Sequence, residues 1–125
     1  NVRPHPVFER DGSDVYCEVP ISFTEAALGA EIDIPTLEGT QKYTIPEGTQ
    51  SGTVFTIRGK GIKSARNGTG NLILRVVVEV PSKLSKEQRK LLEKWEESVE
   101  LKQYDKMKRY ADNVESLYGK KPYEK

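Results

Sequence analysis

The sequence has few of the side chains on which enzymes and metal sites depend, because Cys17 is its only cysteine and His5 its only histidine. One cysteine excludes an intrachain disulfide and a zinc site made of several cysteines, and it suits a reducing compartment such as the cytoplasm. With one histidine, a catalytic triad, a histidine-based metal cluster or a phosphoryl-transfer site would lack supporting partners. We therefore interpret His5 as a loop residue and expect no enzyme, no cofactor and no metal site.

Long apolar runs and an excess of one charge are also absent. No stretch approaches the roughly 18 to 20 apolar residues that span a bilayer. Twenty basic and nineteen acidic side chains give a formal net charge of +1, so no overall field would attract the chain to nucleic acid or to an anionic membrane. Residues 1–6 have neither the pattern of a signal peptide nor an initiator Met. We expect a cytoplasmic, soluble fragment of a longer chain.

Alternating apolar residues predict that the first two thirds of the chain is rich in strands. Residues 14–22 alternate with the period of a half-buried strand. Shorter runs around 32–34, 43–45 and 54–57 follow, each bounded by Gly or Pro turn residues. Residues 72–80 carry apolar side chains on both faces, which indicates a central strand. Several short strands in sequence favour a small sandwich or a partly open barrel.

A short helix is expected inside this β region. Residues 23–29 begin with Thr24, which we take as the N-cap, and place Phe23 and Leu28 as a hydrophobic staple. Gly29 then ends the helix. The pattern returns to strand directly afterwards, so this helix is an insertion and not a separate layer.

Two further features have ordinary explanations. The Gly59-Lys60-Gly61 segment fits neither a Walker loop nor a dinucleotide fingerprint, and no helix is expected after it, so we interpret it as a tight β-turn. Lysines and glutamates are intermixed over residues 83–97, which is typical of a solvated helical surface and not of a basic stripe. Neither feature therefore predicts a phosphate site or a nucleic-acid interface.

The composition changes after Pro81 to Lys, Glu, Gln and Leu, which favour helices. Ser85 followed by Gln88 has the pattern of a capping box. Two amphipathic seams follow. The first comprises Leu91, Leu92, Trp95 and Val99, and the second comprises Tyr104, Met107, Ala111, Val114 and Tyr118. These helices can pack on their own β domain or against a second copy of the chain, and the limited surface of so small a sandwich favours association.

The predicted fold class is mainly β: a small β-sandwich or partly open barrel with one short inserted helix, followed by C-terminal amphipathic helices. The predicted divisions are an interdomain linker at residues 1–13, a β-rich domain at 14–82, a helical region at 83–119 and a tail at 120–125.

Five ordered segments of the sequence resemble the second carboxy-terminal domain of DnaJ-type co-chaperones, the heat-shock J-proteins, and the junction before it. They are His5 to Tyr16, Val19 to Gly29, Ile34 to Gly39, Ile45 to Gly52, and Arg58 to Gly61. The resemblance covers residues 2–95, and the part after Val99 is longer and more helical than expected of that family.

The resemblance implies a non-enzymatic module of protein folding and the stress response, which binds unfolded or extended client polypeptide and homodimerises. The J-domain tripeptide His-Pro-Asp, through which the family stimulates a DnaK-type chaperone, has no match, since Val7 follows His5-Pro6. Zinc-binding Cys-x-x-Cys repeats are also missing. The DnaK-type chaperone is therefore expected as a partner only through a J-domain of the full-length protein. The alternative is a β-sandwich adaptor or ligand-binding domain without chaperone activity.

Client holding requires a shallow apolar groove beside an exposed strand edge. Residues 30–35 form a short run between turns, which suits an edge strand. The candidate client-binding residues are Ile32, Ile34, Leu37 and Phe55, each of which has ordinary core packing as the alternative. The candidate dimerisation residues are Leu91, Leu92, Trp95, Tyr104 and Met107. Nothing in the sequence suggests nucleic acid or a membrane as a partner.

Overall fold

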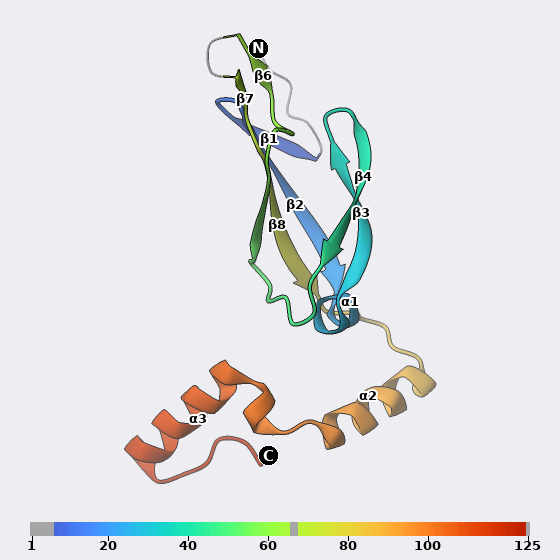
Figure 1. Cartoon of the computed structure of the whole chain (residues 1–125). Coiled ribbons are helices and arrows are strands. Elements are labelled where there is room, and N and C mark those ends of the chain that lie inside the picture. Colours follow the sequence, from blue (N-terminus) through green and yellow to red (C-terminus); the bar gives the residue numbers. More distant parts are fainter. Residues whose placement is uncertain (1–6, 66–67, 125) are drawn as a thin grey trace. The chain divides into compact units, whose positions relative to one another are not determined.

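The structure is a computed structural model that describes residues 7–65 and 68–124. The chain divides into two compact units, Asn1–Pro81 and Ser82–Lys125. The first contains the strands and one short helix, and the second contains the C-terminal helices (Figure 1). His5, the first part of the predicted linker and the last residue of the predicted tail lie outside the described residues.

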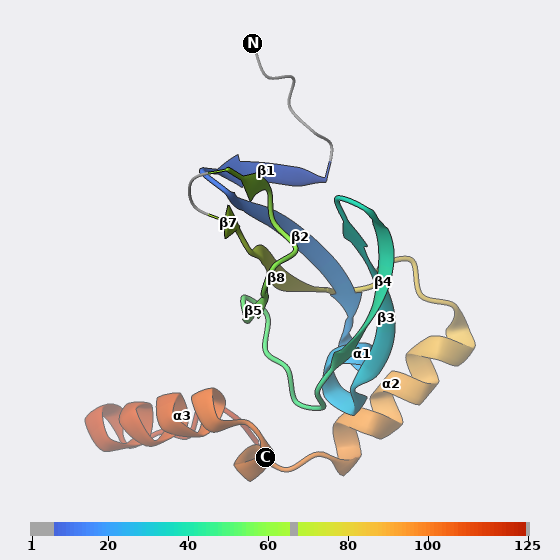
Figure 2. The same ribbon diagram turned by 45° about the horizontal axis from the view of Figure 1, so that its top comes forward.

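A four-stranded sheet forms the larger layer of the first unit. Its strands, in spatial order, are β1 (Phe8–Asp11), β2 (Asp14–Ser22), β8 (Leu72–Glu79) and β5 (Val54–Ile57). The β2–β8 pair is parallel and the other two pairs are antiparallel. The central place of β8 confirms the prediction for residues 72–80, and β1 forms one edge of the sheet (Figure 2).

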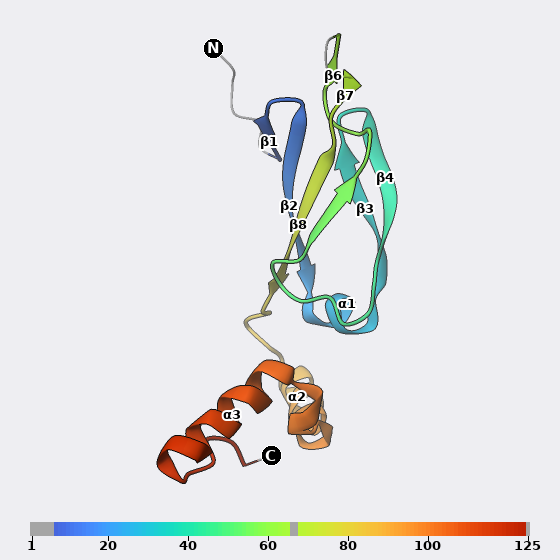
Figure 3. The same cartoon turned by 60° about the vertical axis from the view of Figure 1, so that its left-hand side comes forward.

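A hairpin of β3 (Ala30–Thr36) and β4 (Gly39–Ile45) forms the second layer. It lies alongside the four-stranded sheet (Figure 3), and Ile34 shares a buried cluster with residues of β2 and β8. The buried core residues of the sheet are Val15, Cys17, Ile21, Leu72, Leu74 and Val76. A further two-stranded pair, β6 (Lys63–Ser64) with β7 (Gly68–Thr69), completes the described strands. The predicted mainly β class is confirmed.

The N-cap of the short helix α1 (Phe23–Leu28) lies two residues earlier than predicted. Ser22 is the N-cap: the Glu25 backbone N–H donates to the Ser22 hydroxyl at 3.1 Å, and the Ser22 N–H donates to a Glu25 carboxylate oxygen at 2.9 Å. This reciprocal capping box satisfies two backbone donors, which a cap at Thr24 would not do. The assignment of Thr24 as the N-cap is therefore wrong. Gly29 does end the helix, with φ +80° and backbone atoms of the β4 end within 3.0 Å of where a Cβ would stand.

The second unit contains α2 (Lys86–Ser98), a 3₁₀ turn η1 (Leu101–Gln103) and α3 (Asp105–Tyr118). The predicted capping box is confirmed, since the Gln88 N–H donates to the Ser85 hydroxyl at 3.1 Å. Gly119, in the left-handed conformation, ends α3. Among the helices of the described residues, none combines the length and the apolar character that a membrane span requires.

Cys17 points into the core, as the alternation predicts, and only 3% of its surface is exposed. Burial raises the pKa of its thiol, so less of the reactive thiolate is present near pH 8 than in the unfolded chain.

We expect native Cys17 to react with iodoacetamide about a thousandfold or more slowly than in the urea-unfolded chain, because alkylation must wait for rare opening. Mass spectrometry of timed samples measures this rate. Stability should also fall as the pH rises above the pKa of the unfolded thiol, because only the unfolded chain then releases the proton. Equal rates in the folded and unfolded chains would contradict the buried position of Cys17.

Candidate functional site

The candidate client-binding residues of β3 lie on one face of the β3–β4 hairpin. Ile32 stands opposite Tyr43 on β4 and Ile34 opposite Gln41. Residues two apart on a strand share a face, so Ile32 and Ile34 both point to the sandwich interior. Their exposure differs: Ile34 is fully buried, whereas Ile32 is half-buried and packs against both core clusters. Only Ile32 of this pair offers surface that an incoming peptide can contact directly.

Phe55 comes from β5 and meets the hairpin through an aromatic contact. Its ring lies edge-on to Tyr43, with 5.5 Å between the ring centroids, a favoured arrangement of two aromatic rings. Both rings are half-buried and pack against the same two clusters as Ile32. Tyr43 was not among the predicted site residues. The available signal was its alternation with Ile45, which places both side chains on one face of the strand.

Leu37 stands apart from the other predicted residues. It lies between β3 and β4 and is 49% exposed, and it belongs to neither core cluster. The structure therefore brings Ile32, Ile34 and Phe55 together around Tyr43 and leaves Leu37 at the hairpin end.

The edge of β3 supplies the backbone part of a peptide site. Among the described strands β3 pairs with β4 alone, as expected of an edge strand, so its second edge is available for another extended chain. On the outer face of the hairpin, the Lys42 ammonium donates to the Asp33 carboxylate at 3.0 Å. This hydrogen bond, and the negative charge of Asp33, raise the pKa of Lys42. The two faces of the hairpin are thus distinct, one apolar and one charged.

The candidate dimerisation residues on α2 are exposed. Leu91 is 60% exposed, Leu92 41% and Trp95 42%, and no residue of α2 is buried. Leu92 and Leu84 also line a cavity of about 400 Å³, whose rim includes Glu93. An amphipathic helix that buries none of its apolar side chains retains a surface suited to another protein.

Most apolar residues of the second predicted seam are less exposed to solvent than those of α2. Tyr104, between η1 and α3, and Met107 are both half-buried, and Ala111 is buried. The seam opens towards its end, where Tyr118 is 75% exposed. Much of Tyr104 and Met107 is therefore already covered in a single copy of the chain.

Comparisons with known proteins agree on one family. A family model described as "DnaJ C terminal domain" matches residues 1–81. The chain is similar to proteins called "Chaperone protein DnaJ" in two bacteria. It is 47% identical over 119 residues to that of Acetivibrio thermocellus, covering 94% of this chain and 31% of the relative. It is 45% identical over 122 residues to that of Clostridioides difficile, covering 97% and 32%. The chain thus spans about a third of the length of these curated relatives.

Proposed function

Because the chain belongs to the family of DnaJ C-terminal domains, we propose that it binds unfolded or extended client polypeptide beside β3 and homodimerises through its C-terminal helices. The family is non-enzymatic, which agrees with the sequence analysis. The match also confirms the resemblance that the ordered segments of the sequence indicate.

The observation that carries the client-binding proposal is the half-buried apolar group of Ile32, Tyr43 and Phe55, because Ile32 belongs to β3, whose second edge pairs with no described strand. An extended peptide at this edge gains backbone hydrogen bonds and buries alternate side chains at the same time. Backbone pairing does not depend on sequence, and three apolar residues carry no charge pattern. The site therefore suits many different clients with modest affinity. Ile34 supports it from within the core, and Leu37 extends it at the hairpin end.

Homodimerisation is supported by the exposed Leu91, Leu92 and Trp95 of α2. In a dimer with two-fold symmetry the same patch faces itself, so an apolar surface is complementary without any charge pairing. Tyr104 and Met107 contribute through the surface that remains exposed on them.

The partners of the full-length protein follow from the same family membership. We propose that non-native polypeptides are its clients and that a DnaK-type chaperone acts with it through a J-domain outside this chain. A cytoplasmic location suits both and suits the single reduced cysteine. Neither nucleic acid nor a membrane is expected as a partner.

Replacing Ile32 with serine should weaken the binding of an apolar extended peptide about tenfold. Full burial of such a side chain is worth roughly 1.5 to 3 kcal/mol, and the peptide covers only the part of Ile32 that the domain leaves exposed. Suppression of aggregation of a chemically unfolded substrate should fall in parallel. Light scattering measures suppression, and fluorescence anisotropy of a labelled peptide measures affinity. Circular dichroism first establishes that the variant is folded.

Leu28→Ser is the matched control, since Leu28 on α1 is 76% exposed and lies outside the candidate site. It should suppress aggregation as the parent does. A parent chain that suppresses no aggregation would favour the adaptor alternative. If Ile32→Ser and Leu28→Ser lose the same amount of peptide affinity, the client site does not lie at β3.

A further inference from the structure

The outer face of the four-stranded sheet, on the side opposite the core, holds a cavity that the client-binding proposal does not use. In β2 the core residues Val15 and Cys17 alternate with the exposed Tyr16 and Glu18. The pairing of the strands places Glu9, Tyr16 and Ile73 in one row across β1, β2 and β8. Around these residues lies a cavity of about 610 Å³, within the size range of ligand sites.

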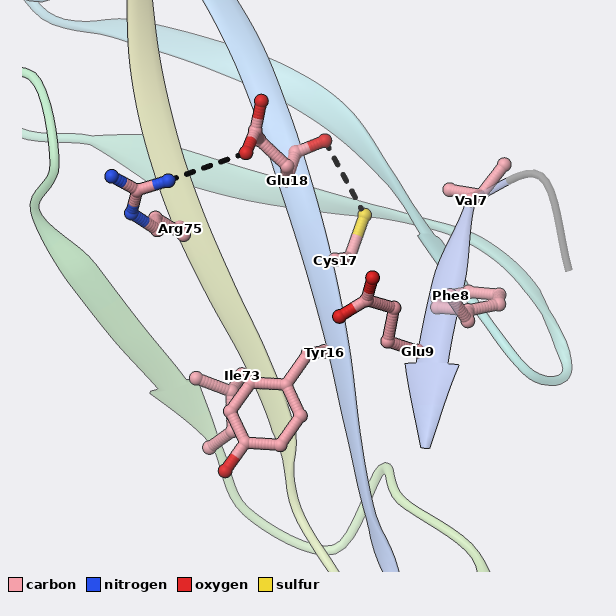
Figure 4. A pocket seen from close by; sticks show the side chains of 8 residues that line it. All are labelled: Val7, Phe8, Glu9, Tyr16, Cys17, Glu18, Ile73 and Arg75. Carbon is pink, nitrogen blue, oxygen red and sulfur yellow. Dashed lines mark hydrogen bonds and ion pairs between the residues drawn. The ribbon is translucent and has the colours of Figure 1, made fainter. Parts of the chain in front are cut away.

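Two carboxylates, Glu9 and Glu18, line this cavity together with one basic group, Arg75. Glu18 and Arg75 face each other on paired strands and form an ion pair at 3.3 Å. Glu9 also lines the cavity, and it takes part in no ion pair within the described part of the chain. Figure 4 shows its side chain extending from β1 towards β2, while Arg75 is directed to Glu18. Among the described residues, the Glu9 carboxylate is thus the charged group of this cavity that has no ion-pair partner.

The other side chains that line the cavity are mainly apolar, namely Val7, Phe8, Tyr16, Cys17 and Ile73. Val7 is 42% exposed, Tyr16 39% exposed, and Ile73 half-buried. The lining comes from three neighbouring strands, which span about 10 Å at the usual strand spacing. Three residues of an extended peptide have the same length. An extended peptide that turns a basic side chain towards Glu9 also turns the side chains two positions before and after it to the same face. Apolar residues at those positions match the apolar part of the lining.

We propose that this outer-face cavity binds an extended peptide segment that presents an arginine or lysine between apolar residues, with the basic group paired to Glu9. The site lies on the opposite side of the sheet from Ile32 and is independent of the proposed function at β3. It gives the domain a preference for basic apolar segments that the uncharged surface at β3 does not provide.

The test compares two labelled peptides, Val-Leu-Arg-Leu-Val and Val-Leu-Gln-Leu-Val, by fluorescence anisotropy with the full chain. The arginine peptide should bind more tightly than the glutamine peptide. Glu9→Gln should weaken the arginine peptide about two- to fivefold, the range of a solvent-accessible ion pair, and leave the glutamine peptide unchanged. The preference should also shrink in high salt, which screens an exposed charge pair.

Glu38→Gln is the matched control, because Glu38 is exposed at the β3–β4 turn and should leave both affinities unchanged. Ile32→Ser should keep the preference for arginine even if it lowers overall affinity, which separates this site from the one at β3. Equal binding of the two peptides to the parent would overturn the proposal, and so would equal effects of Glu9→Gln and Glu38→Gln. Displacement of the peptide by spermidine at the peptide's own concentration would also overturn it, in favour of a small-cation site.

Discussion

A chain that ends after Ser82 should be a monomer, whereas the intact chain should be a dimer and a chain that ends after Glu100 a weaker dimer. Leu91, Leu92 and Trp95 are exposed in a single copy, and burial of each is worth roughly 1.5 to 3 kcal/mol. Three from each protomer contribute on the order of 10 kcal/mol. The cost of association is itself about 4 to 15 kcal/mol. The difference between these two free energies is small, so loss of Leu91, Leu92 and Trp95 together should abolish the dimer.

Sedimentation velocity of the three chains at micromolar concentration tests this order. Trp95→Ala in the intact chain should weaken the dimer at least tenfold, and Tyr118→Ala reports whether the open end of the second seam also contributes. A monomeric intact chain would refute dimerisation through these helices. An undiminished dimer after removal of all residues beyond Ser82 would place the interface on the β domain.

The strands were predictable from the sequence because each shows its own periodicity, but their partners were not. β2 alternates because one face is buried. β8 is buried on the same side of the sheet, at Leu72, Leu74 and Val76, while Ile73 and Val77 on its other face are only partly buried. The parallel β2–β8 pair joins Val15 to Leu72. Nothing local in either segment specifies a partner so distant in sequence, since pairing depends on how the whole chain closes its core.

The start of α1 shows how a local pattern can have two interpretations. Thr24 and Ser22 both have hydroxyl groups suited to a helix cap. Only Ser22 has Glu25 three positions later, where its carboxylate can accept the Ser22 N–H in return. The second hydrogen bond favours Ser22. The same rule correctly predicted the start of α2 at Ser85, where the sequence offers one candidate.

The sequence predicted which candidate client-binding residues share one face of a strand, but it did not predict how deeply each of them is buried. Alternation placed Ile32 and Ile34 on the same side, which the structure shows. Burial depends on what covers each residue, and β2 and β8 cover Ile34 more fully than Ile32. Tyr43 joins the site through its pairing with Ile32 across the hairpin, a contact that only the register of the two strands reveals. These differences determine which substitutions can test binding.

Ile34→Asp should unfold the β domain and not merely weaken peptide binding. Ile34 has no exposed surface. A buried polar group without a hydrogen bond destabilises the fold by about 1 to 3 kcal/mol, and an unpaired carboxylate in an apolar core destabilises it by about several kcal/mol more. Domains of this size are stable by only about 5 to 15 kcal/mol. By comparison, Ile34→Val should cost about 0.5 to 1.5 kcal/mol and Ile34→Ala about 2 to 5 kcal/mol.

Urea unfolding followed by circular dichroism measures these costs, and Leu37→Asp is the control. Leu37 is 49% exposed at the hairpin end, where a surface substitution usually changes the free energy of unfolding by about 0.5 kcal/mol or less. An Ile34→Asp chain that unfolds at the urea concentration of the parent would show that this side chain can reach solvent. In that case Ile34 would join Ile32 as a direct contact for the client. Loss of structure instead would assign Ile34 to the support of the site and leave Ile32, Tyr43 and Phe55 as the residues that a peptide touches.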